Sequence, residues 1–163
     1  MTDDEITALI RRKRAGKLQA PARAEAVAEV EAVVGHRMPA LLRRLYLDVS
    51  DGGFDPYNAA LSLDDHDFLH SDAGRLVDEY LQWRAHIPGY PSHVVPLLSL
   101  GCAMWAHVDW STPEGRIWRW DPGPCERHSL FRDTVSLSEQ LTEWYAGVDR
   151  RPRNPPCGPD CLS

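Results

Sequence analysis

The period at which apolar residues recur changes along this chain, and that change limits its possible folds more than any other feature. Up to about residue 86, apolar residues return every three or four positions, the spacing of one helix face. From Val94 to Asp121 they form a continuous run and then alternate, which is the spacing of strands. Helical spacing returns after Ser136. This order predicts a single α+β domain, a mainly antiparallel twisted sheet flanked by helices, with the helices covering one side.

Start and stop residues mark the first three predicted helices. Asp3 or Asp4 can cap the first, whose basic side chains gather toward its C-terminal end, where the helix dipole favours cations. A second helix is predicted from Pro21, which suits a first helical turn, to the stop at Gly35. Pro39 opens a third, which ends near Gly52-Gly53.

Two further helices are predicted around the strands. The first is capped by Ser71 or Asp72 and ends at Pro88-Gly89, and its apolar face consists of Leu76, Tyr80, Leu81 and Trp83. The last begins in Ser136-Leu137-Ser138-Glu139, a capping box, and ends by Gly147.

The strands are predicted at Val94–Leu100, Ala103–Trp110 and Arg116–Asp121, with a further short one at Ala59–Leu63. Ser111–Gly115, between the last two long strands, contains the Pro and Gly of a hairpin loop. We expect the stretch from Pro122 to the capping box to be loop, because it is rich in Pro, Gly and charge.

A chain of 163 residues is about the size at which one core buries most of the apolar surface. We expect an N-terminal helix in residues 1–20, a body in 21–148, and a proline-rich, flexible or loosely attached tail in 149–163. No apolar run approaches the roughly 18 residues of a membrane span, and the acidic N-terminus has no apolar signal core. These features favour a cytoplasmic protein.

Four cysteines are too few for a disulfide scaffold in a chain of this length, so we expect reduced thiols. Cys102 falls at the start of a predicted strand and is interpreted as a small core residue. Cys157 and Cys161 could supply half of a zinc site, but a closed site needs four ligands and no second pair lies nearby. We therefore predict no cofactor.

Acidic charge is concentrated in the middle of the chain. Residues 21–148 hold 19 of the 24 acidic and 10 of the 18 basic side chains, a net charge of -9. The acidic segment, residues 48–79, has nine acidic side chains and one basic side chain, Arg75. Such a field repels nucleic acid and anionic membranes and attracts basic proteins, although it can also be a purely solubilising surface.

An enzymatic interpretation depends on the same segment. His66 and His70 lie four positions apart among Asp64, Asp65 and Asp67, all residue types that metal sites use. The sequence has no HExxH arrangement, no G-x-S-x-G elbow and no phosphate-binding glycine motif, so an acidic surface loop is the simpler interpretation.

Six tryptophans fall mostly at apolar or alternating positions, where burial in the core is the default. Alternation puts Trp118 and Trp120 on one strand face and Ile117 and Arg119 on the other. Either both faces are covered, or an exposed Trp110, Trp118 or Trp120 forms a binding hot spot beside the acidic residues.

Three runs together are similar to a known family. They are EAVVGHRMPALLRRLYLDVSDGG (31–53), PLLSLGCAMWAHVDWSTPEGRIWRWD (96–121) and VSLSEQLTEWYAG (135–147). In this order they resemble the SUKH superfamily of fungal cell-wall regulators (Smi/Knr-like) and bacterial toxin-immunity proteins. Asp51 stands where many members have Asn, and Met38 where many have Leu; both changes preserve the local physics.

The resemblance implies a twisted sheet flanked by helices and, in bacteria, an immunity protein that neutralises a toxin such as a nuclease or deaminase. With the acidic segment, it predicts a non-enzymatic module that binds a basic toxin or other protein. The predicted partner-binding residues are Asp51, Asp55, Asp64, Asp65, Asp67, Asp72, Trp110 and Trp118. The alternatives are a small metal-dependent enzyme that uses His66 and His70, and a cytoplasmic regulatory protein.

Overall fold

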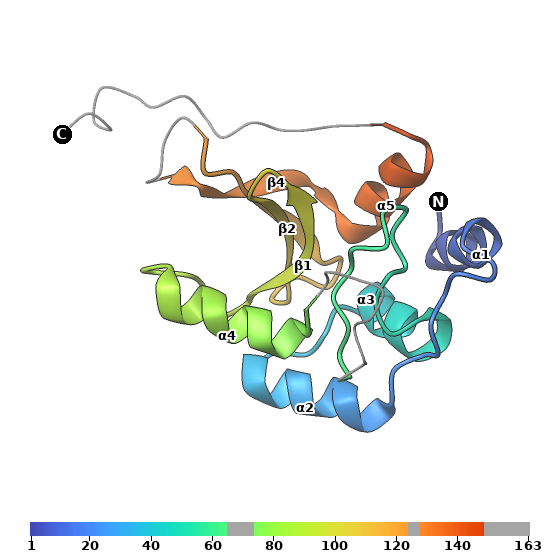
Figure 1. Cartoon of the computed structure of the whole chain (residues 1–163), viewed down its shortest axis with the longest axis horizontal. Coiled ribbons are helices and arrows are strands. Elements are labelled where there is room, and N and C mark those ends of the chain that lie inside the picture. The colour runs from blue at the N-terminus through green and yellow to red at the C-terminus, as the bar shows by residue number, and fades with distance from the viewer. Residues whose placement is uncertain (65–73, 124–127, 149–163) are drawn as a thin grey trace.

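The computed structural model describes residues 1–64, 74–123 and 128–148, and it has the predicted α+β architecture (Figure 1). The elements in chain order are α1 (Asp3–Lys13), α2 (Ala24–Val34), α3 (Ala40–Arg44), the π-helical turn η1 (Leu45–Val49), α4 (Leu76–His86), β1 (Val94–Gly101), β2 (Met104–Asp109), β3 (Arg116–Trp120), β4 (Leu130–Ser136) and α5 (Leu137–Tyr145). The predicted flexible tail, residues 149–163, and the thiols Cys125, Cys157 and Cys161 lie outside the described residues.

Capping interactions fix where the outer helices start. Ser136 and Glu139 form the predicted capping box of α5. At α1 the cap is Thr2 rather than Asp3 or Asp4, because the Thr2 hydroxyl accepts the Glu5 N–H while the Glu5 carboxylate accepts the Thr2 N–H. α2 starts at Ala24, later than Pro21, and ends as predicted at Gly35, which has a φ of 76°.

The sheet is antiparallel throughout, in the order β1-β2-β3-β4. Its fourth strand, β4, lies where we predicted loop. The prediction failed because Asp133, at an inward position, interrupts the apolar alternation of the strand and is buried by pairing with Arg119. Ala59–Leu63 is not a strand of its own and joins the edge of β1 through one bridge, Ala60 to Leu98.

The tight turn between β1 and β2 contains Cys102 and Ala103, which have φ values of 51° and 61°. Positive φ at both central residues matches the twist of the flanking strands. The turn leaves Cys102 exposed, so its assignment to the core is wrong.

Helices cover both faces of the sheet, not one side as predicted. Adjacent residues of β3 demonstrate this, because successive strand side chains point to opposite faces. Arg119 donates to Gln140 of α5, whereas Trp120 packs its ring against Trp83 of α4. Figure 1 shows α4 and α5 on opposite sides of the strands. A second cover is needed because one face of β2 and β3 carries aromatic rings. Trp83 of α4 packs on two of these rings, Trp105 and Trp120.

The core runs continuously from the N-terminal helix to α5. Ile6 and Ile10 of α1 are fully buried, so the segment 1–20 belongs to the same core as the body. Leu81, which we placed on the apolar face of α4, is instead 50% exposed, while Leu76 and Tyr80 are buried. Among the described residues, no helix is long and apolar enough to cross a membrane.

We predict that Leu45→Ala and Trp144→Ala each lower the free energy of unfolding by about 2–5 kcal/mol, because each truncation leaves a cavity in the core. Leu81→Ala is the matched control and should stay within about 0.5 kcal/mol of the parent, because Leu81 is half exposed. Urea unfolding of the three variants measures the difference. Equal midpoints for Leu45→Ala and Leu81→Ala would contradict this core assignment.

Candidate functional site

Two aspartates of the acidic segment are interior groups. Asp51 and Asp55 are fully buried. The Asp51 carboxylate accepts the N–H groups of Leu63 and Asp64 at 2.7 and 3.1 Å. The carboxylate of Asp55 accepts the N–H groups of residues 57, 59 and 60 at 2.7–2.9 Å. Their placement on an acidic binding surface is therefore wrong, because backbone donors of the loop that follows η1 occupy both groups.

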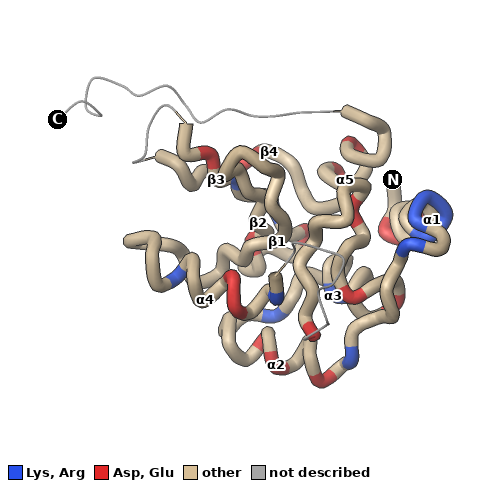
Figure 2. The backbone as a smooth tube through the Cα atoms, in the orientation of Figure 1, with Lys and Arg blue, Asp and Glu red and all other residues tan. Residues whose placement is uncertain are grey.

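Asp64 is partly exposed but paired. Its Oδ1 accepts Arg23 Nη2 at 2.5 Å and Nε at 3.1 Å, and this hydrogen bonding raises the pKa of Arg23. Figure 2 shows acidic residues spread over elements from α1 to α5 rather than gathered on one of them. The described part of the acidic segment is therefore less charged at its surface than its composition predicts.

The other acidic residues predicted to bind a partner, Asp65, Asp67 and Asp72, lie outside the described residues, as do His66 and His70. Within the described ranges no three His, Cys, Asp or Glu side chains come together in a way that could hold a metal ion.

The structure separates the tryptophans that we proposed as exposed. Trp110 is only 4% exposed, so its assignment to a surface hot spot is wrong. It directly follows β2, and its side chain packs in the core. Trp118 and Trp120 are each partly exposed. The hypothesis of an accessible tryptophan therefore narrows to these two side chains on β3.

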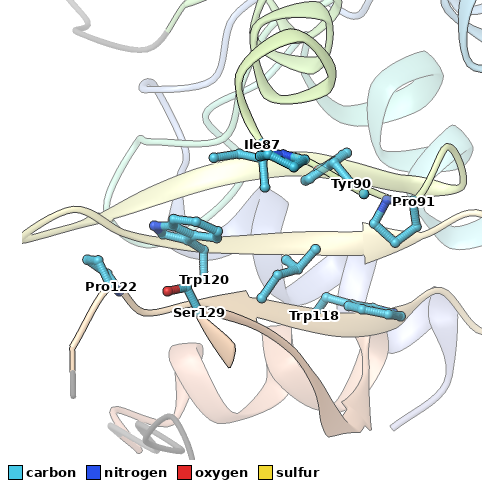
Figure 3. A pocket seen from close by; sticks show the side chains of 10 residues that line it. Ile87, Tyr90, Pro91, Trp118, Trp120, Pro122 and Ser129 are labelled. Carbon is cyan, nitrogen blue, oxygen red and sulfur yellow. The ribbon is translucent and has the colours of Figure 1, made fainter. Parts of the chain in front are cut away.

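An aromatic groove of about 630 Å³ lies on the face of the sheet that carries these two rings. We define the aromatic groove by its lining, the segment Ile87–Pro91 on one wall and Trp118, Trp120, Pro122, Ser129 and Leu130 on the other. Figure 3 shows the Trp118 and Trp120 rings on the same side of the sheet as Ile87, Tyr90 and Pro91.

The groove exists because α4 covers only part of this face. α4 packs against β1. It ends at His86, and the segment Ile87–Pro91 then turns back toward β1 through Gly89, whose φ is 73°. Arg84 fixes this turn by donating to the Tyr90 carbonyl at 2.9 Å. The part of the face above β3 and β4 is left with only partial cover, which exposes Trp118, Trp120 and Leu130.

Each tryptophan of the groove is held by neighbours. Trp118 donates its indole N–H to Asp109 Oδ2 at 3.2 Å, and the Arg132 guanidinium lies 5.1 Å from the centre of its ring. Asp109 is itself oriented by the backbone N–H and hydroxyl of Ser111, at 2.8 and 2.6 Å. Trp120 meets the Trp83 ring edge-on at 5.0 Å. The groove is therefore preformed.

A buried histidine lies beneath the groove. The His107 ring packs edge-on against Trp83 at 4.8 Å, and its Nδ1 forms a 2.9 Å hydrogen bond with the Tyr90 hydroxyl. Burial, with a smaller contribution from Arg119, lowers the pKa of His107 from its ordinary 6.5 to about 3. The neutral ring links the groove wall, through Tyr90, to the sheet.

This arrangement offers aromatic faces, proline rings and few polar atoms, so it can bind apolar, proline-rich or cationic groups. The sequence analysis missed Tyr90, His107 and the Pro-Gly-Tyr-Pro wall. The alternation of Trp105 with His107, in phase with Trp118 and Trp120 on the next strand, was the available signal.

A scan against models of known protein families finds no match, and a search of the curated proteins finds none either.

We predict that His107 makes stability depend on pH. Its pKa is lower in the folded state, so the unfolded chain binds a proton more readily below about pH 6.5. Stability should be constant with respect to this group above that pH and fall below it, by up to about 1.4 kcal/mol per pH unit down to pH 3.

His107→Asn removes the titration, so thermal midpoints of the parent and the variant should converge as the pH falls from 7 to 4.5. All other ionisable groups are common to both proteins and cancel in the difference. A constant difference across this range would show that His107 is accessible to protons in the folded state.

Proposed function

We propose that this chain is a non-enzymatic protein-binding module, an immunity protein that neutralises a basic toxin by docking on the aromatic groove. The observation that carries the proposal is the pair of partly exposed tryptophans, Trp118 and Trp120, on a rigid sheet face. The resemblance of the three sequence runs to immunity proteins supports the biological role.

Exposed tryptophans of this kind have the properties of interface hot spots. Trp is enriched among residues whose truncation weakens binding most, because its ring buries a large area and loses few rotamers. Here Asp109, Arg132 and Trp83 already fix the rings, so little side-chain entropy remains to be lost when a partner binds.

The charge of the body supports a basic partner. Residues 21–148 carry a net charge of -9, and exposed acidic side chains such as Asp48 and Asp78 contribute to that field. Long-range charge of this kind acts mainly on the association rate, while the apolar contact determines how long the complex lasts. The two features thus have separate roles in one interaction.

We predict that Trp118→Ala and Trp120→Ala each weaken binding of the cognate toxin by about 2 kcal/mol, roughly 30-fold, mainly through faster dissociation. The protein encoded immediately upstream is the first partner to test, by calorimetry and by protection of cells that express it. Tyr57→Ala is the matched control, because Tyr57 is 59% exposed and its ring packs on Trp144 of α5, away from the groove.

The variants must first show the parent's far-ultraviolet circular dichroism, so that lost binding is not lost folding. Full protection by both tryptophan variants would exclude the aromatic groove as the docking site. Weaker toxin binding by Tyr57→Ala would indicate that the docking site lies on the face covered by α5.

We also predict that the association rate falls several-fold between 0.1 and 1 M salt, because the Debye length shortens from about 10 to about 3 Å. Stopped-flow fluorescence of the tryptophans measures this rate. A rate that does not change with salt would mean that the net negative charge does not steer the partner.

A further inference from the structure

The hydrogen-bond acceptors along the aromatic groove are largely in use. Four carbonyls of its lining accept hydrogen bonds at 2.9–3.2 Å from other groups of the chain, and these are the carbonyls of Ile87, Tyr90, Pro91 and Ser129. The Tyr90 hydroxyl is engaged as well, by His107. A ligand rich in N–H groups would therefore find few unused acceptors here, and a buried donor without an acceptor is costly.

A donor remains accessible at the Trp120 end of the groove. Trp118 donates its indole N–H to Asp109, whereas the indole N–H of Trp120 has no acceptor among the residues that the structure describes. Unlike the indole N–H of Trp110, it is not buried. Figure 3 shows the Trp120 nitrogen on the side of its ring toward Pro122. The groove thus favours a ligand that brings apolar rings and hydrogen-bond acceptors.

Proline-rich segments have this chemistry. A proline has no backbone N–H, and the extended left-handed helix that such segments adopt has no internal hydrogen bonds, so its carbonyls are free to accept. The helix has three residues per turn and rises about 3.1 Å per residue, so one turn spans about 9 Å. Trp118 and Trp120 lie two positions apart on β3, a distance of about 6.8 Å. One turn therefore reaches across both rings.

Charge differs between the two ends of the groove. Asp121 directly follows Trp120, and its carboxylate accepts a backbone N–H two residues later at 2.9 Å, which fixes a negative charge at that end. The Arg132 guanidinium lies over the Trp118 ring at the other end. A basic residue of the ligand is therefore favoured beside Trp120, and the net charge of -9 carried by residues 21–148 attracts it as well.

We propose that the aromatic groove binds a proline-rich segment of a partner protein in this extended left-handed helix. The proline rings pack on Trp118 and on the wall formed by Ile87–Pro91. One carbonyl of the segment accepts the Trp120 N–H, and a basic residue at one end of the segment lies beside Asp121. That the segment belongs to the toxin rests on the function proposed above, whereas the chemistry of its recognition does not.

A synthetic peptide tests this on the full chain without any toxin. The probe is one arginine followed by nine prolines, with both ends blocked, and the six tryptophan indole N–H signals are followed by NMR during its titration. The Trp120 signal should move downfield and saturate, because its N–H gains an acceptor. The Trp118 signal should move less, because Asp109 already accepts its N–H. A Trp120 signal that does not move would overturn the proposal.

Two substitutions at one position separate the donor from the ring. Trp120→Phe keeps an aromatic ring and removes the N–H, so it identifies the Trp120 signal and should weaken peptide binding about fivefold, the effect of one hydrogen bond. Trp120→Ala removes the ring as well and should weaken binding further. Tyr57→Ala is again the control and should bind like the parent. An unchanged affinity of Trp120→Phe would show that the N–H is not recognised.

Three further probes test the class of ligand. A peptide with alternating glycine and serine in place of the prolines keeps the charge and should not saturate any signal. A proline peptide that begins with glutamate should bind several-fold more weakly than the arginine peptide. Oligothymidine represents single-stranded nucleic acid, which also stacks on aromatic rings. Binding of the glycine-serine peptide or of oligothymidine as tight as that of the arginine-proline peptide would contradict proline recognition.

The outcome is separable from that of the proposed function. Peptide binding without toxin binding supports the recognition chemistry and contradicts only the immunity role. Toxin binding that Trp118→Ala and Trp120→Ala weaken, without any binding of the proline peptide, supports the docking site and contradicts only the proline-rich ligand.

Discussion

The buried ion pair between Arg119 and Asp133 is the interaction on which the rest of the sheet depends. Arg119 donates its Nε to Asp133 Oδ2 at 3.0 Å, and both side chains are almost wholly buried. Removing one partner of such a pair destabilises a fold by about 3–5 kcal/mol, because the other charge stays buried alone. Arg119 also donates to Gln140, so a single guanidinium ties β3 to both β4 and α5. A one-residue slip of β3 would put this charge on the wrong face of the sheet.

The same register determines where the candidate site lies. Because Arg119 must face α5, its neighbours Trp118 and Trp120 must face the other way, toward α4. α4 is too short to cover both tryptophans. The aromatic groove is the part of this sheet face that α4 leaves uncovered. The groove is thus a consequence of how the polar side of β3 is satisfied, and the aromatic residues alone do not determine it.

Sequence patterns predicted the parts of the fold that depend on local chemistry. The period of α1 to α5, the stop at Gly35, the hairpin near Gly115 and the capping box at Ser136 needed only neighbours in the chain. Sequence patterns failed where a partner far away in the sequence determines whether a polar side chain is buried or exposed. Asp133 looked like a loop residue because its partner lies 14 positions earlier, and Asp51 looked like surface charge because its donors lie 12 and 13 positions later. The groove was beyond prediction, since it depends on how far α4 extends over the sheet.

The partners of Arg119, Asp133 and Gln140, both follow it in the sequence, and this order affects folding during synthesis. Gln140 follows Arg119 by 21 positions, which a ribosome adding 5–20 residues per second needs about 1–4 s to synthesise. During that interval the nascent chain already contains α4, which covers part of the aromatic face, whereas the opposite face of β1 to β3 has an unsatisfied guanidinium and lacks its cover, α5. The sheet is complete only when β4 and α5 emerge, and until then the buried face that α5 covers stays exposed to solvent.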